Sequence, residues 1–338
     1  MRVMVTGGTG FVGSHTVAAL MAAGHDVTLL VRSAERLSAA LAPWGITDPP
    51  HHVTGDVTDP DSVRRALDGC DAALHAASVY SLDSRAHRAT RDTNVRGTGI
   101  VLQAALEQGC DPVVHVSSTA ALLRRRAIVV PDAPLSTARG VYTRSKAESE
   151  RIARRWQAEG APVVIVQPGG VIGPGDPHLS DQMLRLRNVL RGQYPMWPRE
   201  GFHACDVRDV ARLHAAVLEP GHGGRRYIVP GHHLDGRTYF GALHTVTGRR
   251  MPHVLLPSVL MLGPARVASA AQRLLPFHVP LEYEGALVTW HDTRCDDSRA
   301  RHELGIQPRS LVDSFAGAVR WLHDAGHLTA KQAGHAVE

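Results

Sequence analysis

The chain has 338 residues, 43% of them hydrophobic, and a formal net charge of +5 at pH 7. This length suits one large domain with a smaller one attached, and the hydrophobic fraction is that of an ordinary soluble protein. Basic and acidic residues are mixed along the chain and only 5% of residues are aromatic, which argues against nucleic-acid binding. No apolar run reaches the roughly 20 residues that a membrane-spanning helix needs.

Cysteines and histidines give no sign of a metal site. The four cysteines are far apart and form no CxxC pair, which argues against disulfides and structural zinc. The 21 histidines follow no clear pattern, and the HH pairs at 51–52 and 232–233 have no HxxxH partner and no neighbouring acidic cluster, so we expect no bound metal. Because residues 1–6 already have the pattern of a strand, we expect no signal peptide and a cytoplasmic location.

Strands alternate with helices over the first half of the chain. Short apolar, β-branched runs predict six strands at 2–6, 25–31, 52–56, 71–77, 112–118 and 162–168. Helical patterns predict intervening helices at 11–24, 59–69, 94–109 and 142–160. One more helix and strand, at 206–220 and 225–231, are expected to return to the sheet. This alternation predicts an α/β fold of the Rossmann type, a doubly wound parallel sheet with helices on both faces.

The pattern changes after Pro168. Segment 168–178 is rich in Gly and Pro, which predicts a loop. The chain then mixes helical and irregular stretches, which predicts a smaller, interleaved subdomain for substrate binding. We assign 1–175 and 205–231 to a Rossmann domain that binds NAD(P), and 176–204 with 232–330 to the substrate-binding subdomain.

Two segments near the end of the chain have a less regular pattern. The apolar run 255–263 is too short to span a membrane, and we expect a buried helix or a pocket wall there more than a membrane contact. The terminal residues, 331–338, are expected to be frayed.

A glycine-rich turn, TGGTGFVG, occupies residues 6–13. It follows the first predicted strand and opens the first helix, a context that favours a dinucleotide-binding turn over a plain turn. Glycines allow a tight turn and close backbone approach, and the helix N-terminus offers unpaired N–H groups to a pyrophosphate. We expect these residues of the turn to contact a cofactor: Gly7, Thr9, Gly10, Phe11, Val12 and Gly13.

The end of the second strand indicates which cofactor is used. Enzymes that bind NAD place an acidic residue there to accept a hydrogen bond from the ribose 2′-hydroxyl. Val31 occupies that position here, and Arg32 follows it. A guanidinium suits a 2′-phosphate, with Ser33 as a second donor. Because arginine is common in this chain, the missing acid is the stronger argument; together they favour NADP(H) over NAD(H).

The stretch GVYTRSK, residues 140–146, places Tyr142 one helical turn before Lys146. Of the 37 basic residues only Lys146 and Lys331 are lysine. Reduction of a ketone leaves an alkoxide that needs a proton, and a tyrosine with a pKa of about 10 becomes a usable proton donor when a cation stabilises its phenolate. Positions i and i+4 share a helix face, so the pair suits this chemistry. The alternative is an exposed helical pair without a chemical role.

Several motifs together resemble a known family. TGGTGFVG, GDVTD, HAAS, VSST, YTRSK and PGGVIGPGD, in this order and spacing, are similar to the extended short-chain dehydrogenase/reductases, the NAD-dependent epimerase/dehydratase family. VRSAER at the end of the second strand favours a resemblance to the dihydroflavonol-reductase-like and 3β-hydroxysteroid-dehydrogenase-like branch of this family. The motifs cover 3–176, DVRDVA at 206–211 matches another family segment, and the resemblance is diffuse beyond about 232.

The resemblance implies roles for individual residues. It implies four catalytic residues, Ser118, Tyr142, Lys146 and Asn94. Ser117 and Thr119 are alternatives to Ser118 in a one-residue shift of the alignment, and Asn94 could instead cap its helix. Further cofactor contacts are implied for Asp56, Val57, Ala76, Ala77, Tyr142, Lys146, Pro168, Gly169, Gly170 and Val171.

These features predict an NADP(H)-dependent oxidoreductase that interconverts a secondary alcohol and a ketone or aldehyde. The alternative is a nucleotide-sugar epimerase or dehydratase with tightly bound NAD, against which the missing acid argues. A third interpretation, a non-catalytic cofactor-sensing protein, conflicts with the Tyr–Lys pair. The apolar content of 254–285 favours a hydrophobic carbonyl substrate.

Two further expectations concern surfaces. The RRR run at 124–126 is interpreted as a solvated loop rather than an anion clamp. Members of the family often pair through the two helices that fall here at about 95–108 and 143–159, so the resemblance also implies a homodimer.

Overall fold

The computed structural model describes residues 1–79, 90–271 and 283–338. Its central element is a parallel sheet of seven strands in the order β11-β7-β5-β4-β1-β2-β3. The strands are β1 (Arg2–Thr6), β2 (Asp26–Val31), β3 (His52–Thr54), β4 (Ala72–His75), β5 (Val113–Val116), β7 (Val163–Gln167) and β11 (Arg225–Ile228). The predicted Rossmann-type sheet is therefore confirmed, including the strand that returns after the helix at 206–220.

Strand order reverses beside β1. The chain moves outward through β2 and β3 and then returns to the other side of β1 with β4. Loops that leave β1 and β4 therefore diverge, which opens a crevice at the carboxyl ends of the strands, the usual place for a ligand in such sheets.

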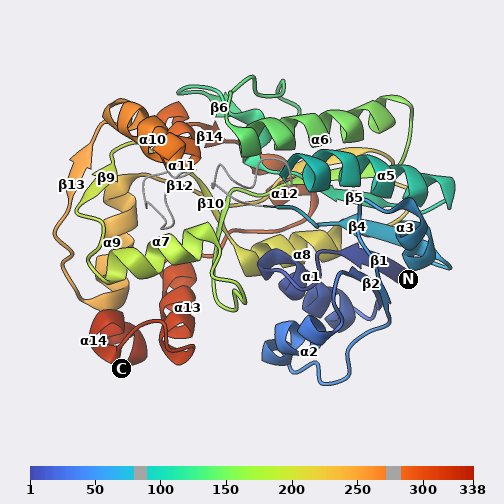
Figure 1. The fold of residues 1–338 in the computed structure, drawn as a ribbon, viewed down its shortest axis with the longest axis horizontal. Coiled ribbons are helices and arrows are strands. Elements are labelled where there is room, and N and C mark those ends of the chain that lie inside the picture. Colours follow the sequence, from blue (N-terminus) through green and yellow to red (C-terminus); the bar gives the residue numbers. More distant parts are fainter. Residues whose placement is uncertain (80–89, 272–282) are drawn as a thin grey trace.

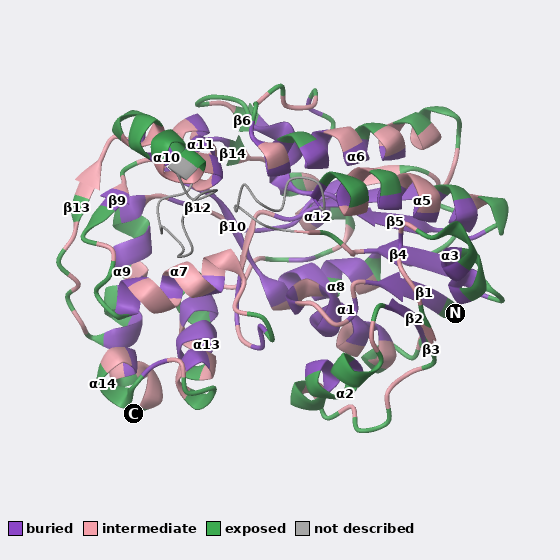
Figure 2. Cartoon of the chain, in the orientation of Figure 1, coloured by how far each residue is buried: buried purple, intermediate pink, exposed green. Residues whose placement is uncertain are grey.

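Helices cover both faces of the sheet (Figure 1). One face carries α1 (Phe11–Ala22), α2 (Glu35–Leu41), α8 (Val207–Ala216) and α12 (Ser298–Glu303), and the other carries α3 (Pro60–Leu67), α5 (Thr98–Glu107) and α6 (Val141–Ala158). Two separate apolar clusters fill these interfaces, and Figure 2 shows the sheet as a buried layer between them. Asp59 caps α3, since its carboxylate accepts a hydrogen bond from the Asp61 N–H at 3.2 Å.

A third apolar cluster lies in the part assigned to substrate binding. Its main elements are α7 (Asp181–Leu190), α9 (Gly236–Thr247), α13 (Leu311–Asp324) and β9 (Met196–Pro198). Beside it runs a three-stranded sheet of β8 (Gly170–Ile172), β10 (Phe202–Asp206) and β12 (His232–Leu234). This small sheet takes strands from both proposed parts of the chain, so the two are joined by backbone hydrogen bonds; the division itself stays an interpretation.

Several smaller elements complete this part of the molecule. β6 (Ile128–Val129) pairs with β14 (Arg294–Cys295), and β13 (Val254–Leu256) pairs with β9. Helix α10 (Val259–Ala271) packs on α11 (Tyr283–His291), which contacts α6. A π-helical segment (Asp92–Gly97) precedes α5, and a short 3-10 turn (Thr119–Leu122) follows β5.

Three expectations about segments are wrong. Residues 168–178 are not all loop, because β8 pairs there with β10. The run 255–263 is no buried helix: it spans the end of β13 and the start of α10, where Val259 and Leu260 are 56% and 62% exposed. The C-terminus is not frayed, because a capping box between Thr329 and Gln332 starts a final helix, α14 (Ala330–Ala333).

In the portion of the chain that the structure describes, no helix is long and apolar enough to cross a membrane. Within the same ranges, no three His, Cys, Asp or Glu side chains gather in a way that would hold a metal ion.

Candidate active site

A large pocket of about 590 Å³ opens at the carboxyl ends of the strands, between the Rossmann sheet and the smaller cluster. All predicted site residues line it except two. The residues in its wall are Gly7, Thr9, Gly10, Phe11, Val12, Gly13, Arg32, Asp56, Val57, Ala76, Ala77, Ser118, Tyr142, Lys146, Pro168, Gly169, Gly170 and Val171. The structure does not bring Ser33 or Asn94 to the wall.

The glycine turn forms one end of the pocket. Gly7 has φ +78°, and a Cβ there would lie 2.7 Å from the Ala77 backbone nitrogen. A Cβ on Gly13 would overlap the Gly7 carbonyl oxygen. Neither position therefore accepts a side chain. Gly10 is the N-cap of α1, so the first N–H groups of this helix face the pocket without partners in the helix itself.

Two arginines lie at the end of β2. Arg32 follows the strand and Arg36 stands one turn later, in α2; both are exposed and both line the pocket. Neither guanidinium has a hydrogen-bond partner among the described residues, and no carboxylate occupies the position of Val31. Sequence analysis missed Arg36, although its spacing of four from Arg32 within VRSAER was a usable signal.

Tyr142 and Lys146 lie in the first turns of α6 and are only 9% and 5% exposed. The Lys146 Nζ is 6.0 Å from the centre of the Tyr142 ring and donates a hydrogen bond to the Val116 carbonyl at 3.2 Å. These residues are therefore a buried pair that shares one helix face, and the alternative of an exposed pair is wrong.

Burial changes the proton affinity of both side chains. It raises the pKa of the Tyr142 phenol, which a hydrogen bond with Ser118 opposes. It lowers the pKa of the Lys146 amine to about 8, against the influence of the nearby Glu150 carboxylate. An amine in this range exchanges its charge close to neutral pH, which is common for groups that take part in proton transfer.

The two serines after β5 point in different directions. Ser118 caps the following 3-10 turn by accepting from the Ala120 N–H at 3.2 Å, and its hydroxyl donates to the Pro168 carbonyl at 3.3 Å. Ser117 instead donates to the Glu150 carboxylate at 2.6 Å. Because Ser118 also bonds Tyr142, the geometry favours it over Ser117 as the hydroxyl of the reacting centre.

Asn94 lies behind the pocket wall and is 2% exposed. Its amide nitrogen donates to the Val79 carbonyl at 3.0 Å and to the Ser145 hydroxyl at 3.1 Å, and its amide oxygen accepts from the Val79 N–H at 2.7 Å. Asn94 therefore ties α6 to the chain after β4, and no hydrogen bond of its side chain caps a helix.

Glu284, in α11, is a pocket residue that the sequence did not reveal. Its carboxylate accepts from the Tyr142 N–H at 3.0 Å and from the Thr143 hydroxyl at 3.2 Å, so it caps the N-terminus of α6. Burial raises the pKa of this carboxyl. Its negative charge adds to the rise in the pKa of Tyr142. Since Glu284 is 142 positions from Tyr142, no local pattern pointed to it.

Comparison with known proteins agrees with this geometry. Residues 3–229 match the model of the NAD dependent epimerase/dehydratase family. A putative dihydroflavonol 4-reductase of Synechocystis sp. is 31% identical over 333 residues, covering 96% of this chain and 95% of the relative. The chain belongs to the NAD-dependent epimerase/dehydratase family.

Solved structures show the same architecture across the chain. The crystal structure of gox2253 resembles it with a TM-score of 0.81 at 28% identity, covering 97% of this chain and 99% of that one. The dTDP-glucose 4,6-dehydratase DesIV of Streptomyces venezuelae, solved with NAD and TYD, has a TM-score of 0.73 at 26% identity, covering 96% and 97%.

As a member of the epimerase/dehydratase family, the protein is an NAD(P)-dependent enzyme of the extended short-chain dehydrogenase/reductase type. Its pocket fits a dinucleotide on two observations. The cradle formed by Gly7 and Gly13 has no room for a Cβ, so only backbone faces the bound group there. The uncapped N-terminus of α1 supplies N–H donors for its phosphates.

Proposed function

We propose that the protein is an NADP(H)-dependent oxidoreductase that interconverts a secondary alcohol and a ketone or aldehyde. The observation that carries the proposal is the convergence of Ser118, Tyr142 and Lys146, all three buried, on the pocket that the glycine turn enters. The cofactor, when bound, supplies or accepts the hydride. Gly7, Gly13 and the first turn of α1 would hold its phosphates.

Each residue of the reacting centre has a defined task. Tyr142 donates a proton to the carbonyl oxygen during reduction and takes it back during oxidation. Ser118 donates a hydrogen bond to the same oxygen and orients it. Lys146, one turn from the tyrosine, stabilises the phenolate by its charge. Asn94 holds α6 in place through Ser145 and acts on the reaction only through that helix.

The preference for NADP(H) rests on the end of β2. Arg32 and Arg36 offer two guanidinium groups at the pocket wall, and the acid that would accept from a ribose 2′-hydroxyl is missing. Two cations suit a 2′-phosphate through charge-assisted hydrogen bonds.

A hydrophobic carbonyl compound is the proposed substrate. The apolar content of residues 254–285 supports this substrate less than expected. No residue of α10 lines the pocket, and residues 272–282 lie outside the described ranges. Apolar side chains from other elements support a hydrophobic substrate instead. The pocket wall includes Val79, Leu123, Leu179, Phe202 and Val288. The reductase named among the relatives points in the same direction.

The alternative, a nucleotide-sugar dehydratase or epimerase, has support from the likeness to DesIV. Such an enzyme would need cations to hold a nucleotide diphosphate. Four arginines lie in and just after α7. Arg185 lines the pocket, whereas Arg187 bonds Asn188 and Arg191 bonds the His327 carbonyl. Arg199 does not line the pocket either. This arrangement favours the reductase.

Two measurements on the purified protein separate these functions. We expect steroid, flavonoid or aryl ketones to drive consumption of NADPH faster than that of NADH, and denaturation to release no stoichiometric cofactor. Release of one equivalent of NAD, without net consumption of either cofactor, would assign the dehydratase or epimerase function. A bound cofactor with no turnover on any carbonyl would assign the sensing function.

A homodimer through α5 and α6 remains part of the proposal. Light scattering coupled to size-exclusion chromatography should give twice the 36.4 kDa of one chain; the mass of a single chain would contradict it.

A further inference from the structure

Glu150 is a fully buried carboxylate on the catalytic helix. Its two oxygens accept hydrogen bonds from the Ser117 hydroxyl at 2.6 Å, the Gln167 amide at 2.8 Å, and the Arg154 Nε and Nη2 at 2.9 and 2.6 Å. A buried charge with this many donors is held in one position, because losing any donor would leave it incompletely paired. Glu150 has no part in the proposed cofactor binding or in the proposed proton transfer.

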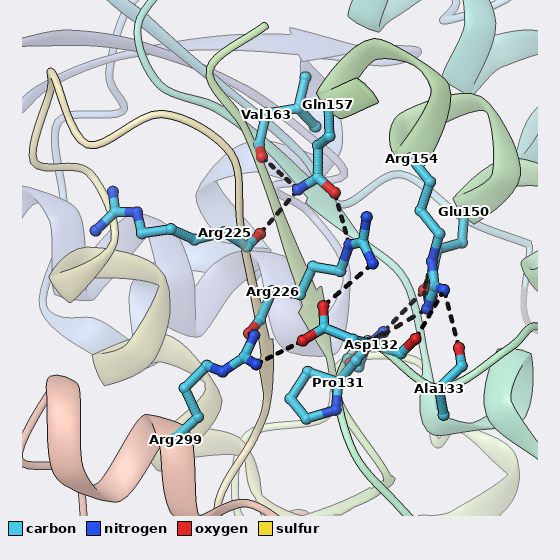
Figure 3. A network of polar contacts seen from close by, with 11 residues as sticks. Pro131, Asp132, Ala133, Glu150, Arg154, Gln157, Val163, Arg225, Arg226 and Arg299 are labelled. Carbon is cyan, nitrogen blue, oxygen red and sulfur yellow. Dashed lines mark hydrogen bonds and ion pairs between the residues drawn. The ribbon is translucent and has the colours of Figure 1, made fainter. Parts of the chain in front are cut away.

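The partner of Glu150 is itself fixed. Arg154 donates from its Nη1 to the Ala133 carbonyl at 2.8 Å and from its Nη2 to the Pro131 carbonyl at 3.2 Å, as Figure 3 shows. Between these residues, Asp132 pairs with Arg226 of β11 and with Arg299 of α12. The carboxylate therefore belongs to a network that reaches the edge of the main sheet.

Glu150 connects two elements that must keep a common register. Ser117 directly precedes Ser118 at the end of β5, and Lys146 lies one turn before Glu150 on α6. The hydroxyl, the phenol and the amine of the reacting centre come from these two elements. The bond between Ser117 and Glu150 is thus a direct side-chain link between them.

The surroundings of Lys146 are poor in charge. His75 of β4 and His115 of β5 are buried behind it with their rings stacked at 6.0 Å. Burial, together with the charge of Lys146, lowers the pKa of both imidazoles, to about 3 for His75, so they are neutral near pH 7. On its own helix the Lys146 Nζ lies 6.0 Å from the centre of the Tyr142 ring, and the charge of Glu150 raises the pKa of its amine.

Other charged groups near α6 are engaged elsewhere or lie further along. Glu284 of α11 caps the helix N-terminus beside Tyr142. Asp92 and Arg96 belong to the π-helical segment that packs on α6, where Asn94 makes the contact to Ser145. Glu150 is accordingly the anion that opposes the cost of burying the Lys146 ammonium.

We propose that Glu150 is a positioning residue that locks the strand carrying Ser118 to the helix carrying Tyr142 and Lys146, and that keeps the Lys146 amine charged. The proposal rests on the proposed function for its catalytic meaning. The state of the Lys146 amine, however, can be measured without any reaction.

The composition of the chain makes that measurement direct. Lys146 and Lys331 are the two lysines of the sequence. Protein labelled with 13C at the lysine ε-carbon therefore gives two NMR signals, and Lys331→Arg removes the one from the exposed C-terminal helix. A pH titration of the remaining signal follows Lys146, whose midpoint we expect near pH 8.

Three variants test the role of Glu150. Glu150→Gln should lower the Lys146 midpoint by roughly one pH unit or more, because it removes the opposite charge that raises the pKa of this amine. Glu150→Asp, which keeps the charge, should stay within about 0.5 unit of the parent value. Glu148 lies on the same helix but pairs with Arg144 at the surface, so Glu148→Gln should also leave the Lys146 midpoint within about 0.5 unit of the parent value. A Glu150→Gln midpoint equal to that of Glu148→Gln would overturn the proposal.

Kinetics test the positioning part separately. Ser117→Ala keeps the carboxylate and removes the link to β5, and it also serves if Glu150→Gln does not fold. We expect kcat to fall about tenfold, the size of one lost hydrogen bond, with KM within twofold and the Lys146 midpoint unchanged. An unchanged kcat would overturn this part. If no substrate is turned over by the parent protein, the proposed function fails while the NMR result still decides on Glu150 and Lys146.

Discussion

The two ends of the pocket are built in different ways. The cofactor end consists of short, local segments, such as the turn between Gly7 and Gly13, and it presents mainly backbone to the pocket. The substrate end gathers side chains from distant segments, and Glu284 reaches Tyr142 across 142 positions. The cofactor end therefore depends mainly on local backbone geometry, whereas the reacting end depends on tertiary contacts between distant segments.

The sharpest test of this separation is Tyr142→Phe. If the two ends are independent, kcat should fall by about 10³-fold, because the proton donor is lost, while the cofactor dissociation constant changes less than about threefold. Steady-state rates and fluorescence titration with NADPH measure the two effects. Tyr283→Phe, which lies outside the pocket wall, is the matched control and should keep the parent rate. An unchanged rate in Tyr142→Phe would remove the reductase mechanism.

A substitution in the glycine turn should affect cofactor binding instead of the proton transfer. Gly13→Ala should weaken cofactor binding by about 100-fold, because its Cβ overlaps the Gly7 carbonyl and forces the turn open. Gly241→Ala is the control, since its Cβ in α9 would meet no atom within 4 Å. Titration of each variant with NADPH gives the affinity. Equal affinities would show that the turn does not hold the phosphates.

A smaller effect should separate the two nicotinamide cofactors. Arg36→Ala is expected to raise the KM for NADPH about tenfold through loss of one charge-assisted hydrogen bond, and to leave the KM for NADH within twofold. Arg64→Ala removes an arginine of similar exposure, paired with Asp61 on α3 and outside the pocket, and should change neither value. Equal changes for both cofactors would place Arg36 away from the 2′-phosphate.

The smallest expected effect lies within the substrate end. Glu284→Gln removes the negative charge that raises the pKa of Tyr142, so that pKa should fall. Alcohol oxidation requires the phenolate, and its rate rises with pH as Tyr142 loses its proton. We therefore expect the rising limb of the pH–rate profile to move to lower pH by roughly 0.5 to 1 unit. Glu148→Gln should not move it, and a limb that stays in place in Glu284→Gln contradicts the assigned influence.

Local sequence patterns were sufficient to predict the fold and the cofactor end of the pocket. Alternating apolar runs identified the sheet, and Gly7 with Gly13 could be recognised because a turn of this kind imposes strict spacing. Tyr142 and Lys146 could be paired because one helical turn fixes their relation. Their catalytic roles remain predictions.

Residues whose contacts are distant could not be predicted in this way. Nothing near position 284 in the sequence indicates that its carboxylate caps α6. Hydrophobicity alone was misleading for Val259, because an apolar run of this length does not reveal which face of α10 meets solvent. Asn94 was expected to be catalytic or to cap its own helix, but its bonds to Val79 and Ser145 put it behind the pocket wall.

The three-stranded sheet limits how this enzyme can diversify. β8 and β12 each pair with β10, although the three strands come from well-separated parts of the chain. Exchange of residues 232–330 as a module would remove β12 and leave an edge of β10 unpaired. New substrate ranges in this lineage should therefore arise by replacement of side chains and loops around α7 and α11, and chimeras that cut through the sheet should yield insoluble protein.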